Sequence, residues 1–204
     1  MAVVNVVNAV SPPRVPPSVP PRVPPSVPPR VPSGPDTRAW YERVLGWAVA
    51  DGPPLRLVTG VRFDVLELPA DAGAGLLRRP GLPTGPVALE GRGMCFLVAP
   101  GAADELEGLL DWLEWGGVGL ELAARGAGGG ITAPEPPGRV RAGNPQGAAV
   151  WLRPPEPGCE ASLPALPGPG RGRGPDLVRL VAAAATECHR ARLWRRTGQP
   201  LAFS

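Results

Sequence analysis

A proline repeat limits what the first part of this chain can form. Residues 11–32 read SPPRVPPSVPPRVPPSVPPRVP, in which the unit VPPx recurs with Arg and Ser alternating at the fourth place. Proline fixes φ and has no backbone N–H, so this density of proline excludes a helix or an interior strand. We expect an extended polyproline II arm of about 3.1 Å per residue, on the order of 65 Å if straight. Residues 1–35 are predicted to be disordered, because they offer too little apolar surface to offset the entropy of ordering.

The arm also contains a spacing that peptide-binding grooves of the SH3 type recognise. The pattern PxxPxR occurs twice, and its defining residues are Pro17, Pro20, Arg22, Pro25, Pro28 and Arg30. Two interpretations stay open. The arm either recruits a protein partner or is a solvated spacer, because a proline repeat produces such matches without any selection for binding.

Charge is distributed unevenly along the chain. The formal net charge is +3, all 21 basic residues are arginine, and 16 of the 18 acids fall within residues 36–170 beside 11 arginines. That middle part is therefore acidic, whereas the arm and residues 171–204 are basic. An acidic core is a poor electrostatic match for a nucleic-acid backbone, so any phosphate contact is expected to involve the chain ends.

The cysteines and the apolar runs point to a cytoplasmic protein. Cys95, Cys159 and Cys188 are odd in number and share no close spacing, which argues against a disulfide framework and against a CxxC-type metal site. The start, MAVVNVVNAV, lacks the basic residues of a signal peptide, and no apolar run reaches membrane-spanning length. No membrane association is expected.

The middle of the chain alternates short strand patterns with helix patterns. Strands are predicted near residues 48–50, 55–59, 62–68, 86–90, 93–99, 118–124, 129–134 and 148–155. Helices are predicted over residues 36–46, 70–79, 102–115 and 175–196. RGAGGG, residues 125–130, is predicted to be a hairpin turn, and Trp112, Trp115 and Trp151 are predicted to pack in the core. This order indicates an α/β protein of the α+β type, a mixed sheet with hairpins and flanking helices.

Two acids lie in the predicted strand GVRFDVLELPADAG. Side chains alternate between the faces of a strand, so Asp64 shares a face with Leu66 and Leu68, while Glu67 shares one with Val65 and Pro69. A site for Mg²⁺ or Mn²⁺ needs acids at positions i and i+2 on one face. The position two after Glu67 is a proline, so the strand does not supply that pair.

The order of several segments resembles a known family. The segments are LVTG, VLELPADAG, TGPVALEGRGMCFLVAPG, GVGLELAARGAGGGITAPEPP and AVWLRPP. Together they resemble the bifunctional DNA primase/polymerase (prim-pol) domain of the archaeo-eukaryotic primase superfamily, in particular its small stand-alone actinobacterial forms. The likeness covers residues 37–155, and it implies a prim-pol-like domain over residues 36–155 after the arm.

The resemblance also implies where a catalytic site would lie. Active members have an acid-x-acid strand, a histidine after a Gly-Arg pair and a third acid on a later strand. In this chain Glu67 fills the first acid position and Pro69 the second, Gly93 stands where the histidine is expected, and Glu121 supplies the third acid. Proline cannot ligate a cation and glycine cannot contact a triphosphate through a side chain. We therefore expect a degenerate site with Glu67 and Glu121 as remnants, and neither a metal nor a cofactor.

The last part of the chain is basic. Residues 156–174 are rich in Pro and Gly and are predicted to be a linker or an irregular cover, and residues 175–196 a basic helix. Weak nucleic-acid binding is predicted for Arg171, Arg173, Arg190, Arg192, Arg195 and Arg196. In an alternative arrangement, the same helix packs on the core. Its arginines then pair with acids of the core, and its buried residues are Leu177, Leu180, Val181 and Ala184.

Three functions are consistent with these patterns. The favoured one is a non-catalytic prim-pol-like protein with a binding or regulatory role. The second is an active DNA primase/polymerase, a nucleotidyltransferase using Mg²⁺ or Mn²⁺ with Asp64 or Asp71 replacing the lost acid. The third is an adaptor that acts through its polyproline arm.

Overall fold

The computed structural model describes residues 35–138, 148–168 and 175–197. The proline repeat, both PxxPxR matches, Arg171 and Arg173 lie outside the described residues. The predictions made for them therefore stay predictions.

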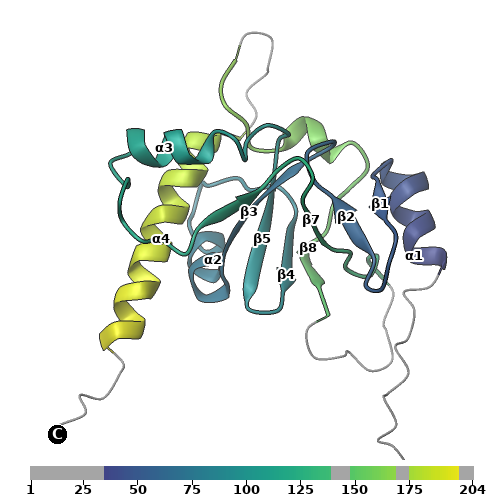
Figure 1. Cartoon of the computed structure of the whole chain (residues 1–204), viewed down its shortest axis with the longest axis horizontal. Helices are drawn as coiled ribbons and strands as arrows, with labels where there is room; N and C mark the ends of the chain where they lie inside the picture. Colours follow the sequence, from purple (N-terminus) through teal and green to yellow (C-terminus); the bar gives the residue numbers. More distant parts are fainter. Residues whose placement is uncertain (1–34, 139–147, 169–174, 198–204) are drawn as a thin grey trace, which may run out of the picture. The chain divides into compact units, whose positions relative to one another are not determined.

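A five-stranded antiparallel sheet forms the centre of the fold, with strand order β6-β3-β5-β4-β8 (Figure 1). Its strands are β3 (Asp64–Pro69), β4 (Val87–Glu90), β5 (Gly93–Val98), β6 (Ala123–Arg125) and β8 (Val150–Arg153). The runs that form β3 and β5 are rich in Val, Leu and Phe, which suit a pleated surface covered on both faces. Both strands are buried along most of their length.

Three helices cover one face of this sheet: α2 (Ala70–Leu77), α3 (Leu106–Trp112) and α4 (Leu177–Thr197) (Figure 1). Leu66 and Leu68 of β3 pack there against the last helix. The predicted apolar face of that helix is confirmed, since its buried residues include Leu177, Leu180, Val181 and Ala184. The last helix is therefore part of the core and not a separate appendage.

A second, three-stranded antiparallel sheet lies over the other face, with order β1-β2-β7. It consists of β1 (Val49–Ala50), β2 (Arg56–Val58) and β7 (Gly130–Thr132). In the chain, β1 comes directly after α1 (Pro35–Trp40) and the π-helical turn η1 (Tyr41–Leu45). Tyr41, Trp47 and Phe63 form an aromatic row in the core between them. The Trp47 indole donates to Glu160 in the 3₁₀ turn η2 (Cys159–Ser162), so part of the predicted linker is a packed cover.

The predicted fold class is confirmed: the domain is α+β, with β1–β2 and β4–β5 hairpins and flanking helices. The strands of each sheet pair only in antiparallel fashion. The prediction of a mixed sheet is therefore wrong in this respect. Short connections require this direction only in the two hairpins, because parallel neighbours need a long crossover connection. The other four pairs join strands that are not consecutive in the chain. Within the residues described, no helix is long and apolar enough to cross a membrane.

The prediction of a hairpin at residues 125–130 is wrong. The segment is a turn, but β6 pairs with β3 in the larger sheet while β7 pairs with β2 in the smaller one. Its glycines permit a close approach to the end of β2. A Cβ on Gly129 would lie 2.8 Å from Thr59 Oγ1, and the Thr59 hydroxyl donates to the Gly126 carbonyl at 2.6 Å.

Three further predictions need correction around α3. The helix covers seven residues instead of the expected 102–115. Residues 102–105 form a turn before it, and after it Glu114 adopts a left-handed φ of 62°, followed by Gly116 and Gly117. The strand expected at 118–124 begins only at Ala123. Trp112 is 71% exposed and does not pack in the core.

Candidate functional site

Three of the residues singled out by the resemblance lie on one face of the five-stranded sheet. Pro69 of β3 pairs with Gly93 of β5, and Glu67 pairs with Cys95 one step along the ladder. Cys95 belongs to the core on the side of the smaller sheet, which places Glu67 on that side too. Positions 67, 69 and 93 are therefore neighbours in the fold.

An arginine that the sequence did not single out occupies this site. Arg125 of β6 donates from Nε at 2.9 Å and from Nη2 at 2.6 Å to Oε2 of Glu67. Its Nη1 donates to Glu90 Oε2 at 3.1 Å and to the Gly130 carbonyl at 2.9 Å. One guanidinium thus lies between two carboxylates and neutralises both in part.

The electrostatics of the site follow from these bonds. Burial alone would raise the pKa of Glu90, but hydrogen bonds from Thr132 and Arg125 outweigh it and bring the pKa below its ordinary value. Burial likewise opposes the charge of Arg125, yet the bond to Glu67 and the charge of Glu90 raise the pKa of Arg125. Glu90 and Arg125 thus hold one another in the charged form.

Cys95 is the thiol closest to this cluster. Burial, followed by the negative charges of Glu90 and Glu67, raises the pKa of Cys95 to about 12. A thiol with such a pKa is protonated at neutral pH and is a poor nucleophile and metal ligand. The cluster therefore offers no activated nucleophile.

Gly93 leaves the space that the Glu67 carboxylate fills. A Cβ built on Gly93 would lie 2.8 Å from Glu67 Oε1. A side chain at this position would therefore require the Glu67 carboxylate to shift while its other oxygen, Oε2, accepts both bonds from Arg125. The absence of a side chain at position 93 and the Glu67–Arg125 pair are parts of one arrangement.

Glu121, the second remnant acid, binds a different arginine. Its carboxylate accepts from Arg195 of α4, which also donates to Asp71 of α2 at 2.9 Å and 3.1 Å. Glu67 and Glu121 therefore serve separate ion pairs. Within the described ranges no group of three or more His, Cys, Asp or Glu side chains is placed to hold a metal ion. The residues present do not fit the two-cation site that the resemblance implies, because arginines bind both remnant acids.

Asp64 points away from this cluster, as the strand alternation predicted. It is 1% exposed, and its Oδ2 accepts from the backbone N–H of Ala103, before α3, at 3.0 Å. Asp71, the other proposed substitute, binds Arg195. Neither acid lies in the cluster formed by Glu67 and Glu90.

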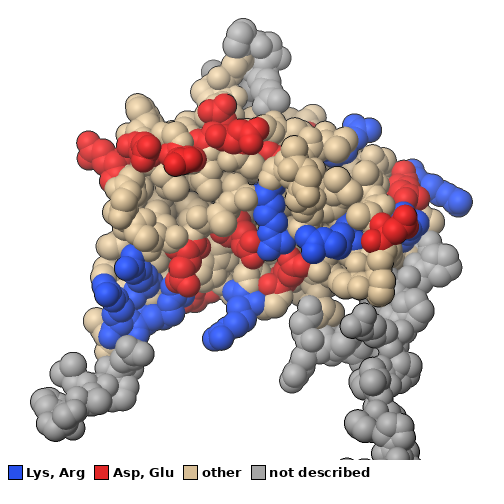
Figure 2. Space-filling view, viewed as in Figure 1, with Lys and Arg blue, Asp and Glu red and all other residues tan. Residues whose placement is uncertain are grey.

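Two arginines near the end of α4 contact other parts of the domain. Arg192 donates to the Gly119 carbonyl and Arg195 binds Asp71 and Glu121, whereas Arg190 pairs at 2.9 Å with the buried Glu187 of the same helix. The alternative in which the helix docks on acids of the core is thus observed. Figure 2 shows the basic cluster at the end of α4, where Trp194 is 72% exposed. Nucleic-acid binding by these arginines stays a prediction.

Sequence reasoning missed Arg125 and Glu90. A usable signal existed for Arg125, because residues 121, 123 and 125 share one face if the segment is a strand. Pairing of that strand with β3 then brings position 125 next to the face of Glu67. No local pattern in the sequence predicts this pairing.

Comparison with known proteins adds no assignment: no family model, curated protein or solved structure matches this chain significantly.

Proposed function

We propose that this chain is a non-catalytic, prim-pol-like protein with a binding or regulatory role. The observation that carries the proposal is the position of the Arg125 guanidinium, which binds Glu67 through two nitrogens and Glu90 through a third. A cation that neutralised these acids would have to displace the arginine first.

The chemistry of nucleotidyl transfer explains why this contact matters. Two metal ions must be clamped in register to stabilise the attacking and leaving oxygens. Here the first acid of the pair is bound to an arginine, the second position is Pro69, and the third acid binds Arg195. Charge-assisted hydrogen bonds of this type are about twice as strong as neutral ones, so their loss would oppose metal binding.

The active-enzyme alternative requires Asp64 or Asp71 to replace the acid that is missing at position 69, and the positions of these two residues do not support it. Asp64 is buried on the opposite face and Asp71 is paired with Arg195. The favoured function therefore remains binding or regulation. We also propose a cytoplasmic location, which the three free thiols support.

A primer-synthesis and extension assay tests the proposal. The full chain is incubated with single-stranded template, nucleoside triphosphates and Mn²⁺ or Mg²⁺, beside Glu67→Ala as a matched variant. We expect incorporation no higher than in a buffer control. Template-dependent incorporation that Glu67→Ala abolishes would overturn the proposal, whereas incorporation equal in both proteins would indicate a contaminating polymerase.

A DNA-binding titration at low salt belongs beside that assay. The comparison should use Arg→Gln substitutions in α4 instead of truncation, because Leu177, Leu180 and Val181 are buried and removing the helix would expose the core. Each phosphate contact contributes a salt slope of about 0.9 for duplex DNA. Binding that the substitutions weaken would assign α4 as the contact surface.

A further inference from the structure

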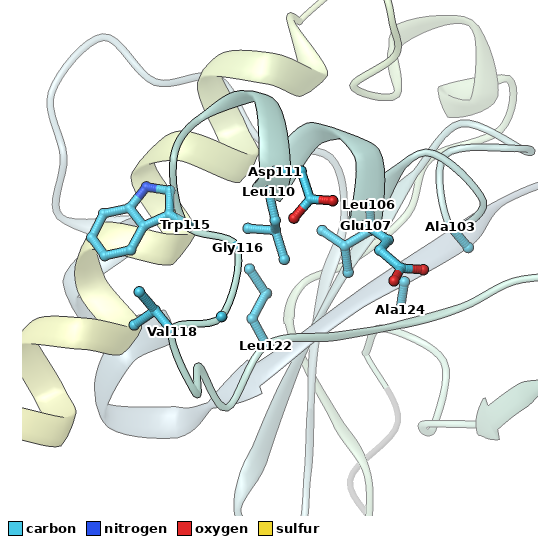
Figure 3. A pocket seen from close by; sticks show the side chains of 11 residues that line it. Ala103, Leu106, Glu107, Leu110, Asp111, Trp115, Gly116, Val118, Leu122 and Ala124 are labelled. Carbon is cyan, nitrogen blue, oxygen red and sulfur yellow. The ribbon is translucent and has the colours of Figure 1, made fainter.

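A groove runs beside α3, on the sheet face opposite to the Arg125 cluster. Its volume is about 390 Å³, and Figure 3 shows Trp115 and Val118 toward one end and Glu107 toward the other. The side chains of Leu106, Leu110 and Leu122 form an apolar floor between them. The groove is independent of the Glu67 site, so an inference drawn from it goes beyond the proposed function.

The aromatic end of the groove is held in place by the last helix. The ring of Trp115 lies against the His189 ring of α4, with centroids 5.6 Å apart and an interplanar angle of 53°. Val118, beside it, is 36% exposed. The groove therefore presents an indole and aliphatic side chains on a supported surface.

The acids along the groove have no partner in the described part of the chain. Glu107 and Asp111 line it and are exposed, and no hydrogen bond or ion pair joins either side chain to a described residue. Figure 2 shows a band of acids over α3, contributed by Asp104, Glu105, Glu107, Asp111 and Glu114. Several acids elsewhere on the domain do bind arginines, among them Glu67, Glu90 and Glu187.

We propose that this groove binds the polyproline arm, residues 11–32, of a second copy of this chain. Grooves that bind polyproline helices are lined by aromatic side chains. Because the polyproline helix is already formed before binding, little conformational entropy is lost. The arm carries three arginines and no acid, so its charge is opposite to that of the two groove acids, Glu107 and Asp111. The indole would pack on proline rings while an arm arginine pairs with Glu107 and Asp111.

The spacing of the two partners agrees with this arrangement. Glu107 and Asp111 are four residues apart on α3, so their side chains are neighbours on one helix face, about 5–6 Å apart at Cβ. The arm arginines recur every eight residues, at Arg14, Arg22 and Arg30. In the predicted polyproline II form, with about 3.1 Å per residue, they would be roughly 25 Å apart, so that one arginine at a time would reach the acid pair. The repeat thus offers three equivalent binding registers.

A second copy is a better source of the arm than the same chain. The arm joins the domain at α1, which packs on the side of the smaller sheet, whereas α3 packs on the opposite side of the larger sheet. As polyproline II, Arg30 lies about 16 Å and Arg22 about 40 Å from Pro35, so within one chain only Arg14, at about 65 Å, spans a domain about 40 Å across. A second copy can offer any of the three arginines. Exchange of arms between two copies gives a closed two-fold dimer in which each groove is filled.

A charge-exchange experiment tests the inference in the full chain. One variant carries Glu107→Arg and Asp111→Arg, and the other carries Arg14→Glu, Arg22→Glu and Arg30→Glu. Sedimentation velocity over a range of concentrations at low salt gives the dimer dissociation constant. We expect the wild type to dimerise and each variant alone to dimerise at least tenfold more weakly, because its arm and groove have the same charge. An equimolar mixture should regain the wild-type dimer, since each variant complements the other.

Controls separate the groove from general acidity. Asp104→Arg with Glu105→Arg makes the same charge change on the same surface but outside the groove, and should keep the dimer. Thermal unfolding of each variant checks that the domain is folded, and the arm variant leaves the domain untouched. A wild type that stays monomeric, a groove variant that dimerises as tightly as the wild type, or a mixture that stays monomeric would each overturn the inference.

Discussion

Arg125 and Glu67 form a two-nitrogen ion pair across neighbouring strands, with Nε and Nη2 at 2.9 Å and 2.6 Å from the same carboxylate oxygen. The remaining guanidinium nitrogen of Arg125, Nη1, extends the pair to Glu90 of β4. The three side chains are partly buried, so solvent screens the pair less than it would at an open surface. This network occupies the place that the resemblance assigns to catalytic cations.

The first prediction concerns Gly93. A Cβ at this position meets Glu67 Oε1 at 2.8 Å, so Gly93→Ala requires the carboxylate to shift against the bonds that its Oε2 accepts from Arg125. We expect a loss of about 1–2 kcal/mol in the free energy of unfolding, the scale of a charge-assisted hydrogen bond. Urea unfolding measures it. In a Glu67→Ala background the same change should cost less than about 0.5 kcal/mol, because the obstacle is gone.

A second glycine provides the control. A Cβ on Gly108 of α3 meets nothing within 4 Å, and alanine favours a helix more than glycine does. Gly108→Ala should therefore leave stability unchanged or raise it. Equal losses from Gly93→Ala with and without Glu67 would contradict the link between the two positions.

The second prediction concerns pH. The pKa of Glu90 in the folded protein lies below its ordinary value of 4.5, so this carboxylate stabilises the fold above pH 4.5. That contribution is lost as the pH falls through the folded pKa, because the unfolded chain binds the proton more readily. Glu90→Gln should therefore be less stable than wild type at pH 7, and the difference should shrink from pH 4.5 downward. Urea unfolding at pH 7, 5, 4 and 3 measures it.

The matched comparison is Glu105→Gln, which removes an exposed acid outside the groove. It measures what the loss of one surface charge without an ion pair to a described residue does to stability. A constant difference between Glu90→Gln and wild type across the acid range would show that the Glu90 carboxylate is not held in its charged form.

Much of this fold can be predicted from sequence, because its strongest signals are local. The β-branched and aromatic run around Asp64 predicts a strand, and the apolar spacing of Leu177, Leu180, Val181 and Ala184 predicts a buried helix face. The contact that decides the site is not local. Glu67 and Arg125 are 58 residues apart, and they meet only because β6 pairs with β3 while β7 joins another sheet. Neither the pairing nor the groove beside α3 leaves a periodic signal.

The third prediction concerns the end of α3, another feature that the sequence pattern did not reveal. Glu114 has a φ of 62°, in the left-handed region that costs a residue with a Cβ about 1–2 kcal/mol. Glu114→Gly should raise the free energy of unfolding by about 0.5–1 kcal/mol after the entropic cost of glycine in the unfolded chain. Thermal unfolding measures it. Glu114→Gln keeps the Cβ and should not reproduce the gain, and an equal gain would assign the effect to charge.

The fourth prediction concerns the thiols. Burial, followed by nearby acids, raises the pKa of Cys95 and Cys188 to about 12 and that of Cys159 to about 11. Alkylation at pH 8 should therefore be slow for all three in the folded protein, and Cys159 should react first because it is only partly buried. Mass spectrometry after a timed reaction distinguishes the sites, and unfolding in urea should release all three. Rapid labelling of Cys95 in the folded protein would contradict its position beside Glu90.

Titration of Mn²⁺ into the full chain tests the central claim most directly, because it asks whether Glu67 is available to a cation. Electron paramagnetic resonance reports the free ion at neutral pH, and Glu67→Gln serves as the matched variant. With Arg125 bound to Glu67 and Glu90, we expect no saturable site tighter than about 1 mM and no difference between the two proteins. Stoichiometric binding in the micromolar range that Glu67→Gln weakens would contradict the account, since it would show that a cation displaces the arginine.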